Sequence, residues 1–443
     1  MTVSRTICLG FIAVILMGAF LLLLPVSTAS GNWNDPIVAL FTATSAVCVT
    51  GHIVVDTATY FSTIGQATIA ALVQIGGLGY MTATTFLLLV IGRKFNLREK
   101  VALQQALDRQ GMQGVAQVVR SIIATTALFE LTGIFLLLLV FVPDHGWGRG
   151  LWLSIFHSVS AWNNAGFSLF SDNLVGYQSS ILINLVIPGL IILGGIGYEV
   201  IFEFYLWLRS SLSPKPEVMI FSLNFKVATS TTLVLLVGGT ITLFCTELRN
   251  PATSGLSLDT QFLLAWFQSV TARTAGFNTV DIGKMTNAAL FVLIALMFVG
   301  GSPGGTAGGI KTTTFRVLTR ITRSILQGKE EVLLYERKVP DSLILKAVGV
   351  TVGSIAAVII ATFGISITDP EVDFIRILFE VVSAFGTVGL STGITAALSA
   401  PAKLILIAMM YVGRVGVLLL MSALVGDPRP SAIHYPEENL LVG

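Results

Sequence analysis

The stretch "FTATSAVCVTGH", from Phe41 to His52, decides the fold because it occurs four times in altered form. The other copies read "FHSVSAWNNAGF" from Phe156, "FQSVTARTAGFN" from Phe267 and "FEVVSAFGTVGL" from Phe379. Each has serine or threonine four residues after phenylalanine, then alanine, then glycine nine or ten residues after the phenylalanine. A pattern that recurs at near-equal spacing indicates an internally repeated structure.

The repeat glycines are Gly51, Gly166, Gly276 and Gly389, separated by 115, 110 and 113 residues. A pair or near-pair of glycines begins 24 to 28 residues after each of them: Gly76-Gly77, Gly194-Gly195, Gly300-Gly301, and Gly413 with Gly416. The unit that repeats is therefore longer than the short motif and includes the apolar segment that comes after it.

The composition is that of a polytopic membrane protein. Of the 443 residues, 54% are hydrophobic and only 11% are charged, with a mean hydropathy of +0.84. A soluble protein of this size needs more charge to cover its surface. The net charge of +2 gives no indication of nucleic-acid binding. We find no paired carboxylates, nucleophile-base pattern or metal-ligand spacing, so the sequence predicts neither an enzyme nor a bound cofactor.

Apolar segments predict eight membrane spans, at about 7–26, 63–91, 118–142, 180–208, 227–245, 286–300, 342–367 and 401–425. A helix needs about 20 residues to cross a bilayer, so 286–300 is short and needs 311–327 to complete the crossing. Shorter segments at 35–48, 149–163, 258–273 and 371–385 can only re-enter the membrane. The predicted fold is all-α, with four span–pore-loop–span repeats around one central pore: 1–109, 110–217, 218–330 and 331–443.

Basic residues gather in the loops 92–115, 209–226 and 311–338, whereas the opposite side is acidic. The positive-inside rule makes those loops cytoplasmic, and an even number of spans puts both termini there too. The first apolar segment also resembles a signal peptide. We expect a retained helix, because its apolar run approaches a full span and the repeat requires it. The opposite side carries Asp35, Asp56, Asp144, Asp172, Glu247, Asp259, Asp281, Asp369, Glu371 and Asp373, which would concentrate cations at an outer mouth.

The residues at the repeat glycines predict an ion filter. Non-helical backbone at membrane depth is tolerated where it lines a water-filled path or is buried in protein. Small or β-branched residues before a glycine leave carbonyls free to replace the water shell of a monovalent cation. The alternative is that the glycines only permit close helix packing. Four aligned copies favour a filter, made of Val49, Thr50, Gly51, Asn164, Ala165, Gly166, Thr274, Ala275, Gly276, Thr387, Val388 and Gly389.

The stretch "GGSPGGTAGGIKTT", from Gly300 to Thr313, interrupts the third repeat. A phosphate-binding loop needs lysine directly after glycine, but Ile310 stands between Gly309 and Lys311. We interpret the stretch, at 300–310, as a movable gating loop below the filter. The predicted gate consists of Gly300, Gly301, Ser302, Pro303, Gly304, Gly305, Thr306, Ala307, Gly308, Gly309, Lys311 and Arg414.

Four other side chains stand out in apolar surroundings. Arg414 lies inside a span, where a charge is costly, and either anchors a buried carboxylate or places a positive charge below the filter. Glu130 predicts a structural ion pair or hydrogen bond. Arg273 is expected to brace the third pore loop. His52 follows a filter glycine and either tunes the outer mouth or is a plain surface histidine.

These motifs resemble the Ktr/Trk/HKT superfamily of potassium transporters over essentially the whole chain, and most closely its bacterial KtrB membrane subunits. The resemblance rests on "TATSAVCVTG", "SAWNNAGFSLFSDN", "TARTAGFNTVD", "SAFGTVGLSTG", "QIGGLGYM" and the glycine-rich stretch. It implies four pore units around one pathway, K+ bound in the filter, and Arg414 holding the gating loop. It also implies a homodimer, with the tail 436–443 at the contact, and a cytoplasmic ring of nucleotide-binding regulatory subunits.

The resemblance also bears on ion preference. Serine at the first filter glycine accompanies sodium transport in plant members, so glycine at all four positions favours potassium. Sodium remains an activator or a co-ion in this interpretation. The alternatives are a sodium or ammonium transporter of the same architecture and a sealed membrane receptor or scaffold.

Overall fold

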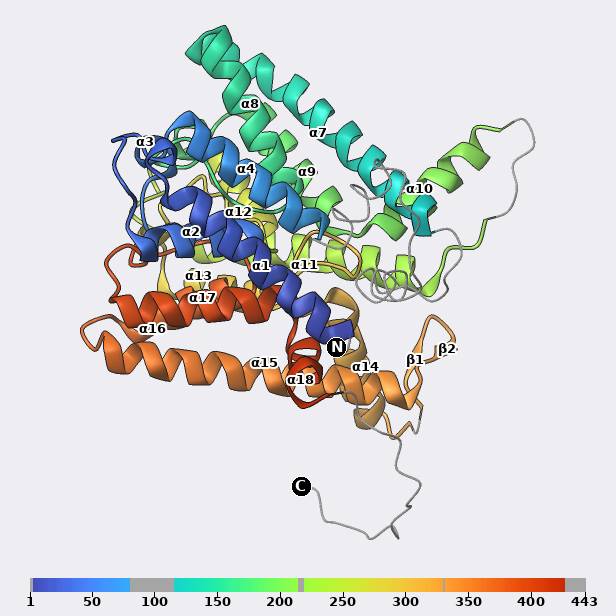
Figure 1. Cartoon of the computed structure of the whole chain (residues 1–443). Helices are drawn as coiled ribbons and strands as arrows, with labels where there is room; N and C mark the ends of the chain where they lie inside the picture. Colours follow the sequence, from blue (N-terminus) through green and yellow to red (C-terminus); the bar gives the residue numbers. More distant parts are fainter. Residues whose placement is uncertain (1–2, 80–114, 214–218, 330, 427–443) are drawn as a thin grey trace.

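A computed structural model describes residues 3–79, 115–213, 219–329 and 331–426. The three predicted repeat boundaries, much of the basic loop 92–115 and the tail 436–443 lie outside these ranges. The described chain is mostly helical (Figure 1), and helices of three kinds recur in the same order.

Four long helices come first in each repeat and correspond to the predicted spans: α1 (Val3–Leu23), α7 (Val115–His145), α11 (Leu223–Glu247) and α15 (Asp341–Thr368). All four are apolar and long enough to cross a bilayer. Much of their apolar surface faces outward, as on α15, where Ile359, Ile360 and Phe363 are exposed. Lipid is the solvent that accepts such a surface, so the protein is an integral membrane protein.

Four short helices follow where re-entrant segments were predicted: α2 (Pro36–Val47), α8 (Trp147–Trp162), α12 (Leu258–Thr271) and α16 (Phe374–Phe385). Side chains cap two of them, with Asp35 accepting from the first turn of α2 and Ser257 from that of α12. Their carboxyl-terminal halves are mostly buried. We call them the pore helices.

The third kind, the inner helices, comprises α4 (Thr63–Leu78), α9 (Ile181–Gly195), α13 (Asn287–Phe298) and α17 (Ala400–Val415). Within the described residues, three of them continue, after a break, into α10 (Tyr198–Ser211), α14 (Thr312–Leu326) and α18 (Val417–Val425). The end of the predicted span 63–91 lies outside those residues. The remaining short elements are α3 (Thr57–Tyr60), the 3-10 turns η1 (Pro25–Ser27), η2 (Val175–Tyr177) and η3 (Ile282–Lys284), and the strands β1 (Leu333–Leu334) and β2 (Arg337–Lys338).

The inner helix is broken in more repeats than the sequence predicted. We expected 180–208 and 401–425 to be continuous, with an interruption in the third repeat. Instead α9 and α10 meet at 104°, and α17 and α18 at 95°. Gly197 and Gly416 stand at these corners with φ of 99° and 89°, a conformation that glycine adopts without steric cost. The bends therefore occur at glycines: Gly197 follows the pair Gly194-Gly195, and Gly416 is the second glycine of the fourth pair.

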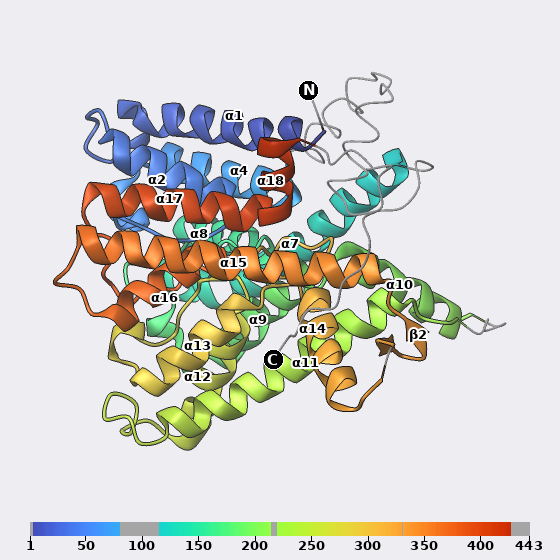
Figure 2. The same cartoon turned by 90° about the horizontal axis from the view of Figure 1, so that it is seen from below.

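The packing order closes the four repeats into a ring. Each long helix packs on the pore helix of its own repeat, and each inner helix packs on the pore helix of the next: α4 on α8, α9 on α12, and α13 on α16. The last contact is that of α17, in the fourth repeat, with α2 in the first. Figure 2 shows α17 lying beside α1 and α2, although they are at opposite ends of the chain.

One end of the helix bundle carries α10, α14 and the β1–β2 hairpin, and the opposite end carries α3 (Figure 1). The hairpin pairs Leu333 with Lys338 and turns through Tyr335 and Glu336. Both turn residues have positive φ, as a two-residue type I′ turn requires. The hydroxyl of Tyr335 and that of Ser230 on α11 lie 2.8 Å apart, which docks the hairpin on the bundle.

The predicted glycine pairs provide close approach between helices. A Cβ on Gly76, Gly194 or Gly413 would overlap the carbonyl oxygen of the last residue of its own pore helix: Val47, Trp162 and Phe385, respectively. Backbone-to-backbone contact of this kind is typical of membrane interfaces rich in small residues. The packing interpretation, which we rejected for the repeat glycines, therefore describes these later glycines.

We expect Gly413→Ala to destabilise the folded protein by about 1–3 kcal/mol, because the added methyl group must displace backbone in a packed core. The matched control is Gly238→Ala on α11, where nothing lies within 4 Å of the new methyl group. That variant should keep or gain stability, since alanine favours helix. Thermal unfolding in detergent, followed by size exclusion, measures both, and equal melting temperatures would contradict the packing role of Gly413.

Candidate functional site: a ring of four glycines

Each pore helix ends shortly before its repeat glycine, and the chain turns back across the helix end. The amide one residue before the glycine donates to the carbonyl of the repeat serine or threonine. The distance is 2.8 Å in the first, second and fourth repeats, from Thr50 to Ser45, Ala165 to Ser160 and Val388 to Ser383. In the third repeat it is 3.0 Å, from Ala275 to Thr271. This short extended piece, which we call a filter strand, is thus anchored to its own pore helix.

The repeat serines have a second use. The hydroxyl of Ser160 donates to the carbonyl of Phe167 at 2.8 Å, and that of Ser383 to the carbonyl of Leu390 at 2.7 Å. Both acceptors directly follow a repeat glycine. The residue pattern that revealed the repeat is therefore the set of groups that holds the filter strands.

The filter strands share an unusual backbone. The residue two before each glycine has a positive φ: 56° at Val49, 57° at Asn164, 69° at Thr274 and 51° at Thr387. The glycines themselves have φ between 68° and 88°, whereas the residue between is not left-handed. Because left-handed and right-handed backbone conformations alternate along the strand, successive peptide carbonyls point toward the same side. Such strain in residues other than glycine costs roughly 1–3 kcal/mol each and clusters at functional sites.

The four glycines lie against one another in cyclic order. A Cβ on Gly51 would overlap the carbonyl of Ala165, and one on Gly166 would meet that of Ala275. Gly276 stands in the same relation to Val388, and Gly389 to Thr50. The structure thus brings together all twelve predicted filter residues, of which all but the half-buried Gly389 are buried. A side chain at any of the four glycines would push on a carbonyl of the next filter strand.

Above the ring, on the side of α3, lies a vestibule that all four repeat glycines line. Its volume, counted as the space open to the centre of a water molecule, is about 410 Å³. Of the predicted outer acids, Asp56, Asp172 and Asp281 line this vestibule. Other acids have structural roles, such as Glu247, whose carboxylate accepts from the amide and hydroxyl of Thr286.

Below the ring, the predicted gating loop crosses to the second repeat. Its amides bond to the end of α9, from Ser302 to the carbonyl of Gly195 at 2.9 Å and from Thr306 to that of Gly194 at 3.1 Å. Gly308 lies so close to the side chain of Thr387, next to the filter, that a Cβ there would overlap its hydroxyl. The loop is therefore packed directly beneath the filter strands.

Two basic side chains hold this loop. Lys311 donates from Nζ to the carbonyl of Ala307 at 2.7 Å. The guanidinium of Arg414 donates to the carbonyl of Thr306 in the loop and to that of Gly76 at the end of α4. Arg414 meets backbone carbonyls here, and its alternative partner, a buried carboxylate, is absent from its described bonds. One arginine of the fourth repeat thus connects the loop of the third to the inner helix of the first.

The other buried charges have structural partners. Arg273, which we expected to brace the third pore loop, donates to the carbonyl of Gly300 at 3.1 Å and so connects that pore loop to the start of the gating loop. Glu130 accepts from Asn163 at 3.1 Å, which is the expected hydrogen bond. The surface interpretation of His52 is wrong, because its side chain is fully buried against Glu380. Sequence reasoning missed Glu380, although a carboxylate within an apolar pore helix is a detectable signal.

Comparison with known proteins shows the family to which the chain belongs. Residues 6–430 match the family model described as TrkH: Cation transport protein. The Ktr system potassium uptake protein B of Bacillus subtilis is 39% identical, covering 100% of this chain and 97% of the relative. The potassium/sodium uptake protein NtpJ of Enterococcus hirae is 38% identical, over 99% of this chain and 97% of its own.

Among solved structures, the potassium transporter TrkH from Vibrio parahaemolyticus has the same fold, with a TM-score of 0.70 at 18% identity. The match covers 95% of this chain and 85% of that one. The closed ring of repeats, the motifs that build it and the full-length family match lead to one conclusion: this chain belongs to the TrkH family of cation transport proteins.

Proposed function

We propose that this protein takes up potassium through the ring formed by Gly51, Gly166, Gly276 and Gly389. The observation that carries the proposal is the ring itself: four filter strands meet in cyclic order below a vestibule lined by acids. Relatives that match the whole chain at 38–39% identity are named potassium uptake or potassium/sodium uptake proteins. The ring supplies a site at which a cation can lose its water.

The filter would work through backbone oxygens. Carbonyls of the twelve filter residues replace the hydration shell of K+. Each pore helix has its carboxyl terminus at the ring, where the helix dipole adds negative potential. Asp56 and Asp172 raise the cation concentration in the vestibule above, whereas Asp281 pairs with Lys284 at 3.1 Å. Each of these effects favours a cation over an anion.

The architecture that serves this pathway is four repeats and eight spans, with units at 1–109, 110–217, 218–330 and 331–443. We place the protein in the cytoplasmic membrane, with both termini on the cytoplasmic side. The basic residues Arg316, Arg320 and Arg323 on α14 support this orientation under the positive-inside rule.

The loop 300–310 is proposed as the gate. Its glycines allow several backbone shapes, and its position beneath Thr387 lets it obstruct the path from the filter. Non-helical backbone at this depth lies beside protein or a water-filled path. Arg414 and Lys311 hold the obstructing shape, and their release would open the path.

Partners and co-ions complete the proposal. The chain forms a homodimer in the lipid bilayer and works with a cytoplasmic ring of nucleotide-binding regulatory subunits, as its resemblance to KtrB subunits implies. Sodium acts as an activator or a co-ion, an idea that the name of the Enterococcus hirae relative supports. The chain itself needs no cofactor in this mechanism.

The test is growth of a strain that lacks potassium uptake on low-potassium medium. We expect growth when this chain is supplied with its regulatory subunit. An empty vector and the chain without its subunit are the controls. A protein that is present in the membrane but does not restore growth or carry flux in vesicles would be a sealed receptor or scaffold. Competition among K+, Na+ and ammonium in the same vesicles decides between potassium and the other cations.

A further inference from the structure

Glu380 is a fully buried acid on the pore helix α16, one residue after the repeat phenylalanine. Its carboxylate accepts from the hydroxyl of Ser391 at 2.7 Å, the amide of Thr392 at 2.9 Å and the hydroxyl of Thr395 at 2.8 Å. A buried carboxylate is costly unless it is hydrogen-bonded. Glu380 therefore sits in a site built to receive it.

The partners of Glu380 connect it to the filter. Ser391 and Thr392 stand two and three residues after Gly389, at the outer end of the fourth filter strand. Through them, Glu380 ties this end of the strand to the pore helix behind it. The strand is thus held at both ends, because Val388 on its inner side donates to Ser383 on the same helix.

The same carboxylate also faces the first repeat. Oε2 of Glu380 lies 3.5 Å from Nδ1 of His52, whose side chain is likewise fully buried. His52 directly follows Gly51, and neither of its ring nitrogens has a hydrogen-bond partner in the described structure. The contact therefore joins the outer ends of filter strands four and one, which adjoin in space where the chain provides no direct connection.

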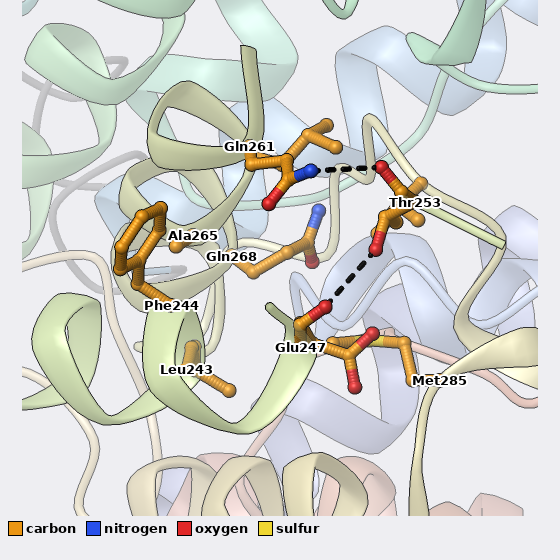
Figure 3. Close-up of a pocket in the computed structure, with 10 residues that line it drawn as sticks. Leu243, Phe244, Glu247, Thr253, Gln261, Ala265, Gln268 and Met285 are labelled. Atoms are coloured by element: carbon orange, nitrogen blue, oxygen red, sulfur yellow. Dashed lines mark hydrogen bonds between the residues drawn. The ribbon is translucent and has the colours of Figure 1, made fainter. Parts of the chain in front are cut away.

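The equivalent position differs in the other repeats. His157 bonds at 3.0 Å to Ser168, on the filter strand of its own repeat. Gln268 instead points into a small cavity beside Gln261, Glu247 and Thr253 (Figure 3), where its amide has no hydrogen-bond partner. That cavity offers about 20 Å³ to the centre of a water molecule, enough for one water. Glu380 thus combines support of its own strand with contact to the next repeat.

We propose that Glu380 and His52 form a clasp that fixes the spacing of filter strands four and one and thereby sets the preference for K+ over Na+. This inference rests on the proposed function of the ring as the ion filter. A larger or more variable ring would coordinate K+ less specifically, since selectivity depends on the number and position of the carbonyls. Glu380 is a positioning residue here, because it acts on the ion through backbone.

The test compares Na+ competition of K+ uptake in Glu380→Gln, His52→Ala and the double variant, each at measured membrane level with the regulatory subunit present. We expect Glu380→Gln to lower the K+ over Na+ preference roughly tenfold, the scale for loss of one charged hydrogen bond. His52→Ala should shift it in the same direction by less. The double variant should resemble Glu380→Gln alone, because the two residues act as one unit.

The control variant is Glu247→Gln, which alters another hydrogen-bonded acid, on α11, whose described bonds go to Thr286 and Asn250 and not to a filter strand. Its ion preference should equal that of the parent. Gly51→Ser serves as the reference for the filter. If Gly51→Ser changes the ion preference whereas Glu380→Gln does not, the proposed clasp is wrong and the proposed filter is retained. If neither changes it, the filter itself is wrong. If Glu380→Gln does not reach the membrane, an unchanged preference in His52→Ala overturns the clasp.

Discussion

Gly51→Ser should lower the preference for K+ over Na+ by at least about tenfold, because one filter carbonyl must move. The new Cβ would overlap the carbonyl oxygen of Ala165 in the next filter strand. The backbone at Gly51 also has a φ of 86°, which a serine adopts only under strain. Ion competition in vesicles that contain the purified protein measures the change.

The matched control for this substitution is Gly31→Ser. Gly31 has a φ of 70°, so serine meets similar backbone strain there, but nothing lies within 4 Å of the added side chain. It lies in an exposed turn between η1 and α2. We expect its ion preference to equal that of the parent. A parent-like preference in Gly51→Ser would remove this glycine from the filter, whatever the stability of the two variants.

Deletion of Pro303 to Ala307 should raise potassium flux about tenfold or more, since it removes the obstruction beneath the filter. The deletion can close without pulling on the helices. The amide of Gly300 already bonds to the carbonyl of Ile310 at 2.8 Å, and Gly308 lies against Gly300. Flux through vesicles at a fixed voltage measures the effect, without the regulatory subunit that would otherwise set the open fraction.

Two point variants separate the length of the loop from its anchoring. Arg414→Ala keeps the loop but removes its bonds to Thr306 and Gly76, so it should raise flux by less than the deletion. Arg376→Ala removes the same charge from an exposed pair with Asp373 on α16 and should leave flux unchanged. A deletion variant that conducts no more than the parent would show that the loop is not the gate.

Much of the architecture could be predicted because membranes restrict it severely. The long helices follow from apolar runs, and α7, α11 and α15 begin and end within four residues of the predicted spans. The pore helices follow from the repeat and from their shortness. The bends between helices could not be predicted in the same way, because a segment such as 180–208 is apolar on both sides of its bend. Only the positive φ of Gly197 distinguishes the bend from a straight helix.

The site was partly predictable for a similar reason. The filter residues share one motif, so their relation could be read without coordinates. Glu380 and His52 belong to different repeats, 328 residues apart in the chain, and no spacing rule connects them. Their contact depends on the closure of the fourth repeat against the first, which places two buried side chains at one seam.

Hydropathy and repetition are local properties of the chain, so the sequence alone was enough to indicate a membrane protein and to predict four repeats, each with a glycine at the turn after its short helix. Only the tertiary structure decided which carbonyl each glycine faces, that the loop lies against Thr387, and that Arg414 reaches both the loop and α4. Those contacts join residues whose positions depend on how all the helices pack at once.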